Sequence, residues 1–281
     1  MMSQYDIVST VTLNNGVRMP RLGLGTFQSE QGDATRDAVL WALQAGYRHI
    51  DTAAIYGNES DVGRGIAESG VPRAEIFVTT KLWNQDHDYD KALRAYDESL
   101  RRLGLDYVDL YLIHWPIKET RESAWKALVR LYEDKRVRAV GVSNYTVRNL
   151  TELLKDSPLA PAVNQFEISP FHTRTALVAY CAQQGIQVES YSPLARGKKW
   201  DDARVSEIAG KYGKTPAQVM IRWALEKGFV VIPKSVRRER IVENARVFDF
   251  ALAAEDIQRL DGLDETLRTI NPPWMKGEWD S

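Results

Sequence analysis

Four titratable residues have the chemical types needed to transfer a proton at a carbonyl group. Asp51, Lys81 and His114 each lie at the end of an apolar run, and Tyr56 follows Asp51 by five residues. A tyrosine with an unperturbed pKa near ~10 is a poor proton donor at neutral pH. A Lys ammonium held by an Asp carboxylate would lower that pKa, so that the phenol protonates an oxygen as hydride reaches its carbon. His114 would donate a hydrogen bond to the same oxygen and orient the carbonyl group.

Each of these residues also has an ordinary structural explanation. Asp51 could cap a helix, and Lys81 could be a solvated side chain. Tyr56 could anchor a loop, and His114 could be a hydrogen-bonded residue near the core. The functional interpretation requires that the fold bring all four side chains to one place. The arrangement of the strands and helices that carry them therefore decides between the functional and the structural explanation.

Eight short apolar runs alternate with longer amphipathic segments along the chain. Most runs are apolar at consecutive positions, which is typical of parallel strands buried on both faces. The amphipathic segments repeat apolar residues every three or four positions, as helices do, and several end at a glycine, at Gly46, Gly70 and Gly185. The predicted strands are Leu22–Phe27, His49–Thr52, Ile76–Leu82, Val108–Trp115, Val137–Ser143, Ala162–Ile168, Gln187–Leu194 and Phe229–Ser235. The predicted helices include Ala34–Ala45, Asn58–Ser69, Tyr89–Leu103, Ser123–Asp134 and Thr173–Gln184.

Eight strand–helix units of about 30 residues predict an α/β fold, a closed (β/α)8 TIM barrel. An open doubly wound sheet is the alternative, but it usually carries a third glycine in its phosphate-binding turn, and Gly23-Leu24-Gly25-Thr26-Phe27-Gln28 lacks one. The turn Asn14-Asn15-Gly16 predicts an N-terminal β-hairpin over about residues 10–19. Catalytic residues of such barrels lie at the carboxyl ends of the strands, where the four candidates are expected, so the barrel favours the functional interpretation.

The composition excludes several classes of protein. Lys and Arg number 37 and Asp and Glu 38, so the chain lacks the basic excess of a general nucleic-acid binder. No apolar run approaches the ~18 residues of a membrane span, and Met1–Asp6 lacks the features of a secretory signal. The single Cys181 allows neither an internal disulfide nor a structural zinc site. We therefore expect a cytoplasmic protein with one domain over residues 1–281 and a C-terminal tail over about 264–281.

Whole motifs of the sequence resemble those of the aldo-keto reductases. The resembling segments are GYRHIDTAAIYGNE at 46–59, TTKLW at 79–83, VDLYLIHWP at 108–116, GVSN at 141–144 and IPKS at 232–235. The resemblance extends from the hairpin to about Phe250 and is greatest to a microbial and protozoan group with diketogluconate reductases and trypanosomatid prostaglandin F synthases. It implies a (β/α)8 barrel and reduction of aldehydes and ketones to alcohols with NADPH as hydride donor. It also implies a catalytic tetrad of Asp51, Tyr56, Lys81 and His114, with Tyr56 as general acid.

The stretch from Lys234 to Arg240 is expected to open the last helix after the last strand. Barrels commonly bind phosphate at this corner, where backbone N–H groups and the helix dipole favour an anion. Its cations would favour a dinucleotide with an additional ribose phosphate, which means NADPH over NADH. A solvated basic helix start or a nucleic-acid patch is the alternative, and the neutral charge of the whole chain favours phosphate. The cations are Lys234, Arg237, Arg238, Arg240 and, one turn on, Arg246.

The resemblance implies further contacts to the cofactor. Ser143, Asn144 and Gln165 match residues that bind the nicotinamide carboxamide, and Tyr191 matches the aromatic residue that stacks on the nicotinamide ring. Arg196 departs from the small residue expected near the pyrophosphate, so it either forms a charged clamp or points to solvent. The other matching positions are Gly25 and Thr26, Ser192 and Leu194 along the pyrophosphate, Lys234, Ser235, Val236 and Arg240 at the adenosine phosphate, and Glu243 and Asn244 at the adenine.

An aromatic wall is expected around the reacting carbonyl group. The substrate-binding residues are expected to be Phe27, Trp83, His114 and Trp115, which follow strands one, three and four. Such a wall accepts apolar aldehydes and ketones. The connection after His114 and the one over 194–201 are short, whereas relatives with tight specificity often have longer loops here. We therefore expect a shallow pocket with broad specificity for small carbonyl compounds, and the tail over 271–279 either covers its mouth or is a loosely tethered terminus.

Two other functions remain open from the sequence alone. One is a regulatory or redox-sensing subunit that binds NADPH and turns over slowly, as in relatives associated with potassium channels. The other is a different barrel enzyme, such as an isomerase or a metal-dependent hydrolase. No clustered His and carboxylate ligands lie at the strand ends, which argues against a metal site. The expected partner is a small carbonyl substrate, with no nucleic acid and no membrane, and the expected state is a monomer.

Overall fold

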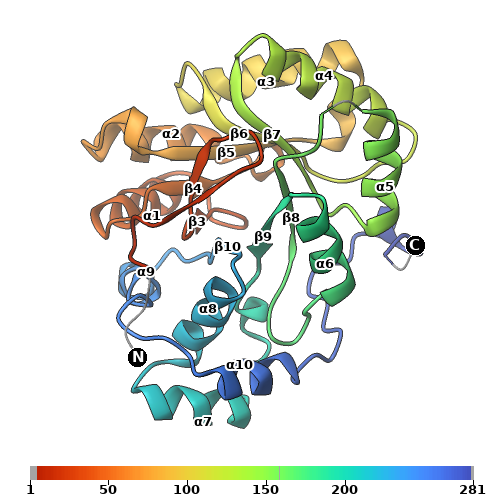
Figure 1. The fold of residues 1–281 in the computed structure, drawn as a ribbon. Coiled ribbons are helices and arrows are strands. Elements are labelled where there is room, and N and C mark those ends of the chain that lie inside the picture. The colour runs from red at the N-terminus through yellow and green to blue at the C-terminus, as the bar shows by residue number, and fades with distance from the viewer. Residues whose placement is uncertain (1–4, 158, 280–281) are drawn as a thin grey trace.

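The computed structural model describes residues 5–157 and 159–279 of the chain. Over these residues eight parallel strands form one sheet in the order β3 to β10, and Figure 1 shows the helices arranged around it. The strands are β3 (Leu24–Gly25), β4 (His49–Asp51), β5 (Phe77–Leu82), β6 (Val108–Ile113), β7 (Val137–Ser143), β8 (Val163–Glu167), β9 (Gln187–Tyr191) and β10 (Val230–Val231).

The sheet closes on itself because the chain beside β10 pairs with the chain beside β3. Parallel bridges join Leu22 to Val231 and Gly25 to Lys234. The Gly23 N–H donates a hydrogen bond to the Val231 carbonyl oxygen. The predicted (β/α)8 barrel is therefore confirmed.

The helices follow the predicted segments closely. Helix α3 has the predicted bounds because Asp88 accepts a hydrogen bond from the Lys91 N–H at its start and Gly104, with φ +63°, ends it. No helix among the described residues has the length and hydropathy to cross a membrane. The α-helices are α1 (Asp33–Gln44), α2 (Glu59–Glu68), α3 (Tyr89–Leu103), α4 (Arg121–Glu133), α5 (Val147–Asp156), α6 (Thr175–Gln183), α7 (Ala203–Tyr212), α8 (Pro216–Glu226), α9 (Arg238–Ala245) and α10 (Ala254–Asp261). Short 3-10 helices are η1 (Ala54–Tyr56), η2 (Arg73–Glu75), η3 (Asn84–Asp86), η4 (Ala195–Gly197) and η5 (Pro273–Met275).

The segment after β10 corrects one prediction. Helix α9 begins at Arg238 rather than at Lys234, and α10 follows it, so α9 is not the last helix. The Arg237 N–H donates a hydrogen bond to the Ser235 hydroxyl oxygen, 3.1 Å away. This bond holds residues 234–237 in a turn ahead of the helix, because a short polar side chain competes with helical pairing.

The predicted N-terminal hairpin is confirmed and closes one end of the barrel. Strands β1 (Thr10–Thr12) and β2 (Arg18–Pro20) pair antiparallel. Met19 of β2 is fully buried and packs in one apolar cluster with Phe77 and Val230. Because these two residues begin β5 and β10, the hairpin covers the amino ends of the strands.

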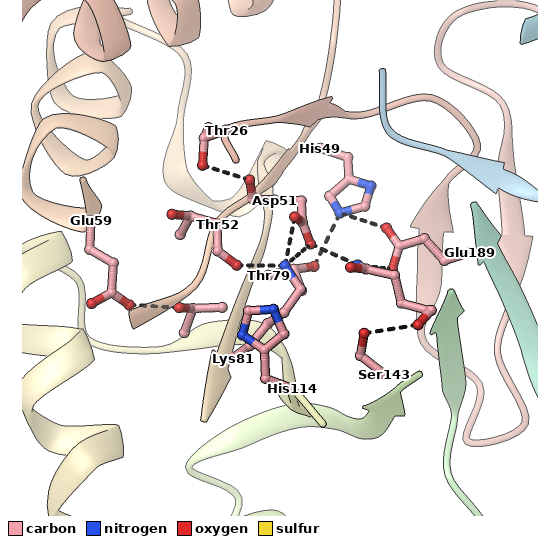
Figure 2. Close-up of polar contacts among 12 residues, drawn as sticks. Thr26, His49, Asp51, Thr52, Glu59, Thr79, Lys81, His114, Ser143 and Glu189 are labelled. Carbon is pink, nitrogen blue, oxygen red and sulfur yellow. Dashed lines mark hydrogen bonds and ion pairs between the residues drawn. The ribbon is translucent and has the colours of Figure 1, made fainter. Parts of the chain in front are cut away.

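Beyond this apolar layer the interior of the barrel becomes polar. Side chains two residues apart on a strand point to the same face, so each strand contributes at successive levels. The first polar level holds His49, Thr79 and Glu189, from β4, β5 and β9, and all three are fully buried (Figure 2). Two residues further along the same strands stand Asp51, Lys81 and Tyr191. The polar side chains thus lead toward the carboxyl ends of the strands.

Candidate active site

The four candidate catalytic side chains meet at the carboxyl ends of neighbouring strands. Asp51 ends β4, Lys81 lies one residue before the end of β5, and His114 directly follows β6. Tyr56 ends η1, the short helix after β4. A cavity of about 720 Å³ is lined by Asp51, Tyr56 and His114, and Lys81 is fully buried behind it. The fold therefore brings the predicted tetrad together.

Lys81 is held by three short hydrogen bonds. Its Nζ donates to Asp51 Oδ1 at 2.7 Å, to Asp51 Oδ2 at 2.8 Å and to the Thr52 carbonyl oxygen at 2.8 Å (Figure 2). Burial raises the pKa of Asp51, while Lys81 and a hydrogen bond from Gln165 act in the opposite direction. The ammonium lies 5.2 Å from the centre of the Tyr56 ring. All three protons of the ammonium are engaged, so its position below the phenol ring is fixed.

The protonation of Tyr56 corrects a second expectation. The prediction that Lys81 lowers the pKa of Tyr56 is wrong for this structure. Burial raises that pKa well above its usual value, and the carboxyl groups of Asp51 and Glu189 raise it further. The charge of Lys81 does not offset them, since Asp51 pairs with the ammonium. The phenol is therefore protonated across the neutral pH range and has a proton to donate.

His114 is a neutral hydrogen-bonding group. Burial lowers its pKa well below the usual value, and the charges of Lys81 and His87 lower it further. Its ring meets Tyr56 edge-on at 5.6 Å and stacks parallel to Trp115 at 6.1 Å. A neutral imidazole can donate one hydrogen bond to a carbonyl oxygen beside the Tyr56 hydroxyl.

The predicted aromatic wall lines the cavity. Phe27, Trp83 and Trp115 all contribute to it, and the Phe27 ring lies 5.1 Å from the Tyr56 ring. The tail adds a fourth aromatic residue, Trp274, whose ring meets Trp83 at 5.9 Å and Trp115 at 6.0 Å. The tail therefore covers part of the mouth as far as it is described; residues 280–281 of the predicted tail lie outside the described residues.

A buried carboxylate anchors the tail. Glu167, at the end of β8, accepts hydrogen bonds from the Thr269 N–H at 2.9 Å, the Ile270 N–H at 3.1 Å and the Thr269 hydroxyl. Glu167 is 2 % exposed, so these bonds are shielded from solvent. Trp274 is thus positioned by backbone that is tied to the barrel.

Most of the predicted cofactor residues line the same cavity. Thr26, Ser235, Val236, Glu243 and Asn244 do not. The Thr26 hydroxyl donates to the Asp51 carbonyl oxygen, and Glu243 accepts a hydrogen bond from the Thr215 hydroxyl at the start of α8. Those that line the cavity are Gly25, Ser143, Asn144, Gln165, Tyr191, Ser192, Leu194, Lys234 and Arg240.

The five cations of the cluster do not lie together, and Arg237 lines neither of the two cavities. Lys234 and Arg240 line the large cavity. Arg238 and Arg246 instead line a separate surface cavity beside Trp41. Only part of the basic stretch can therefore contact a cofactor in the large cavity.

Polar side chains beside the tetrad are joined to one another by hydrogen bonds. Asn144 donates to the His114 carbonyl oxygen at 3.0 Å and accepts from the Tyr191 hydroxyl at 2.7 Å. The Gln165 Nε2 donates to Asp51 Oδ2 at 2.8 Å and to Glu189 Oε2 at 2.9 Å. Both hydrogens of the Gln165 amide are used in this way, which leaves its carbonyl oxygen as the acceptor for a carboxamide.

This donor set fits a phosphorylated nicotinamide dinucleotide. Lys234 and Arg240 supply positive charge for phosphate, and Gln165 and Tyr191 supply an acceptor and a ring face for a nicotinamide carboxamide. Among the described residues, no group of three or more His, Cys, Asp and Glu side chains could hold a metal ion.

Arg196, for which the sequence left two alternatives, donates to Gln28 Oε1 at 2.6 Å, so it does not simply point to solvent. Several other residues of the cavity and of the layer below it were not predicted from the sequence. Glu189 left a visible signal, because a carboxylate stands inside a predicted strand, two residues before Tyr191. The other missed residues that line the cavity have no such signal: Ile55, Pro193, Gly197, Trp200, Ile232, Ile270 and Pro272.

Comparisons with known proteins agree with this geometry. The model of the Aldo/keto reductase family matches residues 21–265. The chain belongs to the aldo/keto reductase family. Carbonyl reduction with NADPH is the chemistry of this family, and the chain is an NADPH-dependent aldo-keto reductase.

Its relatives include the microbial and protozoan proteins that the motifs indicated. Glyoxal reductase of Bacillus subtilis is 51% identical over 263 residues, which cover 94% of this chain and 95% of the relative. The 9,11-endoperoxide prostaglandin H2 reductase of Trypanosoma cruzi is 50% identical over 266 residues, which cover 94% of each chain. An aldo-keto reductase of Bombyx mori, solved in complex with NADP, is 38% identical with a TM-score of 0.90, over 96% of this chain and 97% of that chain.

Proposed function

We propose that Tyr56, Lys81, Asp51 and His114 carry out the reduction, with a broad range of small aldehydes and ketones as substrates. The observation that carries this proposal is the meeting of the four side chains at one end of a cavity that is walled by Phe27, Trp83, Trp115 and Trp274. The cofactor supplies a hydride to the carbonyl carbon when it is bound.

Each residue of the tetrad has one task in this proposal. Tyr56 donates its hydroxyl proton to the carbonyl oxygen and accepts that proton back in alcohol oxidation. The neutral imidazole of His114 donates a hydrogen bond to the same oxygen and orients it. Lys81, fixed by Asp51, lies beneath the phenol ring, where its ammonium holds the ring in position through a cation–π contact.

The cofactor contacts are assigned to the predicted residues that line the cavity. Gln165, Asn144 and Ser143 would hold the carboxamide, and Tyr191 would stack on the nicotinamide ring. Lys234 and Arg240 would pair with phosphate. Thr26, Ser235, Val236, Glu243 and Asn244 do not line the cavity, so in this proposal they support the residues that do.

The breadth of the substrate range follows from the walls of the cavity and from the relatives. Apolar aromatic walls contribute burial but few directional bonds, so they discriminate weakly between small carbonyl compounds. The two relatives described above are named for glyoxal and for a prostaglandin endoperoxide, which are chemically diverse. We further infer a single-domain monomer that acts in the cytoplasm, in line with the balanced charge and the single cysteine.

A steady-state panel tests this proposal. NADPH oxidation is measured with glyoxal, an activated aromatic aldehyde and a bulky ketone, and each assay is repeated with NADH. We expect turnover of several small carbonyl compounds with NADPH and a lower kcat/KM with NADH. Tight NADPH binding without turnover of any compound would instead favour the regulatory subunit that the sequence left open.

A further inference from the structure

Glu189 is a fully buried carboxyl group that the proposed mechanism does not use. It lies in the middle of β9 and faces the interior of the barrel, one level below Tyr191. Burying a carboxyl group without a cation is costly, so such a residue needs an explanation. Neither packing nor a salt bridge to Lys or Arg among the described residues supplies one.

The contacts of Glu189 connect it to the tetrad. Its Oε2 accepts a hydrogen bond from Gln165 Nε2 at 2.9 Å, and the same nitrogen donates to Asp51 Oδ2 at 2.8 Å. Asp51 in turn binds Lys81 at 2.7 Å. The Gln165 amide therefore joins the carboxyl groups of Glu189 and Asp51. Asp51 in turn holds Lys81 under the Tyr56 ring.

The other side of Glu189 faces a histidine. Its Oε1 lies 3.6 Å from His49 Nε2, which is also 3.1 Å from the Thr79 hydroxyl oxygen (Figure 2). Burial and the charge of Lys81 lower the pKa of His49 to about 3, so the imidazole is neutral and does not balance a carboxylate. Glu189 therefore has no cationic partner on this side.

The remaining neighbours of Glu189 carry no compensating charge. Strand β10 contributes Val230 and Val231, and β8 contributes the uncharged Gln165. The charged groups that face it are Asp51 from β4 and Lys81 from β5, which already pair with each other. Burial and the charge of Asp51 raise the pKa of Glu189 to about 8, so this group changes charge just above neutral pH.

We propose that Glu189 is a positioning residue for the reductase reaction: through Gln165 it holds Asp51 on Lys81, and its charge state governs proton transfer by Tyr56. This inference rests on the assignment of Tyr56 as the proton donor. The charges of Asp51 and Lys81 cancel, so when Glu189 is neutral the interior beneath the Tyr56 phenol has no net charge. With an ionised Glu189 the phenolate form of Tyr56 is disfavoured, because like charges repel in a buried site.

Glu189→Gln tests the proposal, because it keeps the hydrogen bond from Gln165 and removes the charge. We expect the alkaline fall of kcat/KM for reduction to move to lower pH by at least ~0.5 unit, and the rise of alcohol oxidation to move in the same direction. NADPH affinity should change by less than about twofold. Glu59→Gln is the matched control: Glu59 is buried and binds Thr80 and Arg102, but it does not perturb Tyr56. Its pH profiles should equal those of the wild type.

Unchanged pH profiles in a folded Glu189→Gln enzyme, or an equal shift in Glu59→Gln, would overturn the proposal. This failure is distinct from that of the proposed function, because loss of turnover in Tyr56→Phe would still establish the proton donor. If Glu189→Gln does not fold, infrared spectra of the wild type decide. A protonated carboxyl band that disappears between about pH 7 and pH 9 supports the proposal, and the absence of such a band contradicts it.

Discussion

At the scale of single residues, the reductase depends on which groups keep their protons. Tyr56 has a raised pKa and His114 a lowered one, so one is a protonated phenol and the other a neutral imidazole at neutral pH. The sequence predicted that these two residues share one site but gave the wrong direction for the pKa of Tyr56. That direction depends on burial and on the pairing of Lys81 with Asp51, which only the folded arrangement determines.

A second residue-scale feature is the division of the arginines between two cavities. Arg240 lines the cavity that holds the tetrad, and Arg238 lines the separate surface cavity beside Trp41. Arg240→Leu should weaken NADPH binding by about tenfold or more, because a charge-assisted hydrogen bond contributes ~1.5–3 kcal/mol. NADH affinity should change much less, because NADH lacks the additional phosphate. Fluorescence titration measures both values. Arg238→Leu is the matched control, and an equal loss of NADPH affinity in that variant would contradict the assignment of Arg240.

At the scale of elements, the sequence predicted best where local signals mark both ends of a segment. Strand β7 and helix α3 have the predicted bounds, and α3 lies between a side-chain cap at Asp88 and a left-handed glycine at Gly104. Strand β10 is shorter than predicted, two residues instead of seven, because Pro233 has no N–H to donate to a neighbouring strand. The tail could not be predicted, because its place depends on long-range bonds to Glu167.

Close packing between elements predicts opposite effects for two helical glycines. A Cβ on Gly63 of α2 would lie 2.0 Å from the Leu103 carbonyl oxygen at the end of α3, whereas a Cβ on Gly210 of α7 meets nothing within 4 Å. Gly63→Ala should therefore cost about 1–3 kcal/mol of stability through overpacking. Gly210→Ala should increase stability by up to ~1 kcal/mol, since alanine favours the helix. Thermal unfolding compares the two, and equal shifts in the melting temperature would refute this account of the α2–α3 contact.

At the scale of the whole molecule, buried titratable groups set the pH range of stability. Burial lowers the pKa of His87 and His172 to about 4 and that of His49 to about 3, and it also lowers the pKa of His114. The unfolded chain binds these protons near pH ~6.5, so stability is lost as the pH falls below that value. Glu189, with a pKa of about 8, acts in the opposite direction between ~4.3 and about 8, because the folded chain retains its proton.

The histidines outnumber the buried acids with raised pKa values, so their effect dominates below neutrality. We expect the free energy of unfolding to be greatest near pH ~6.5, to fall steeply toward pH ~4 and to fall more gently toward pH ~8. Urea unfolding across this range measures it. In Glu189→Gln the free energy of unfolding should still fall steeply toward pH ~4 but should no longer fall between pH ~6.5 and ~8. Stability that is constant or that rises toward acid would show that the histidines are not held neutral.

In the proposed reaction Tyr56 donates the proton, whereas the cavity binds the cofactor without the Tyr56 hydroxyl. The most direct test measures NADPH oxidation with an aromatic aldehyde and NADPH affinity in the wild type and in Tyr56→Phe. We predict that the variant loses at least ~100-fold in turnover, within the range of general acid catalysis, and keeps its NADPH affinity within about threefold. Near-normal turnover by Tyr56→Phe would contradict the account, because another group would then be protonating the carbonyl oxygen.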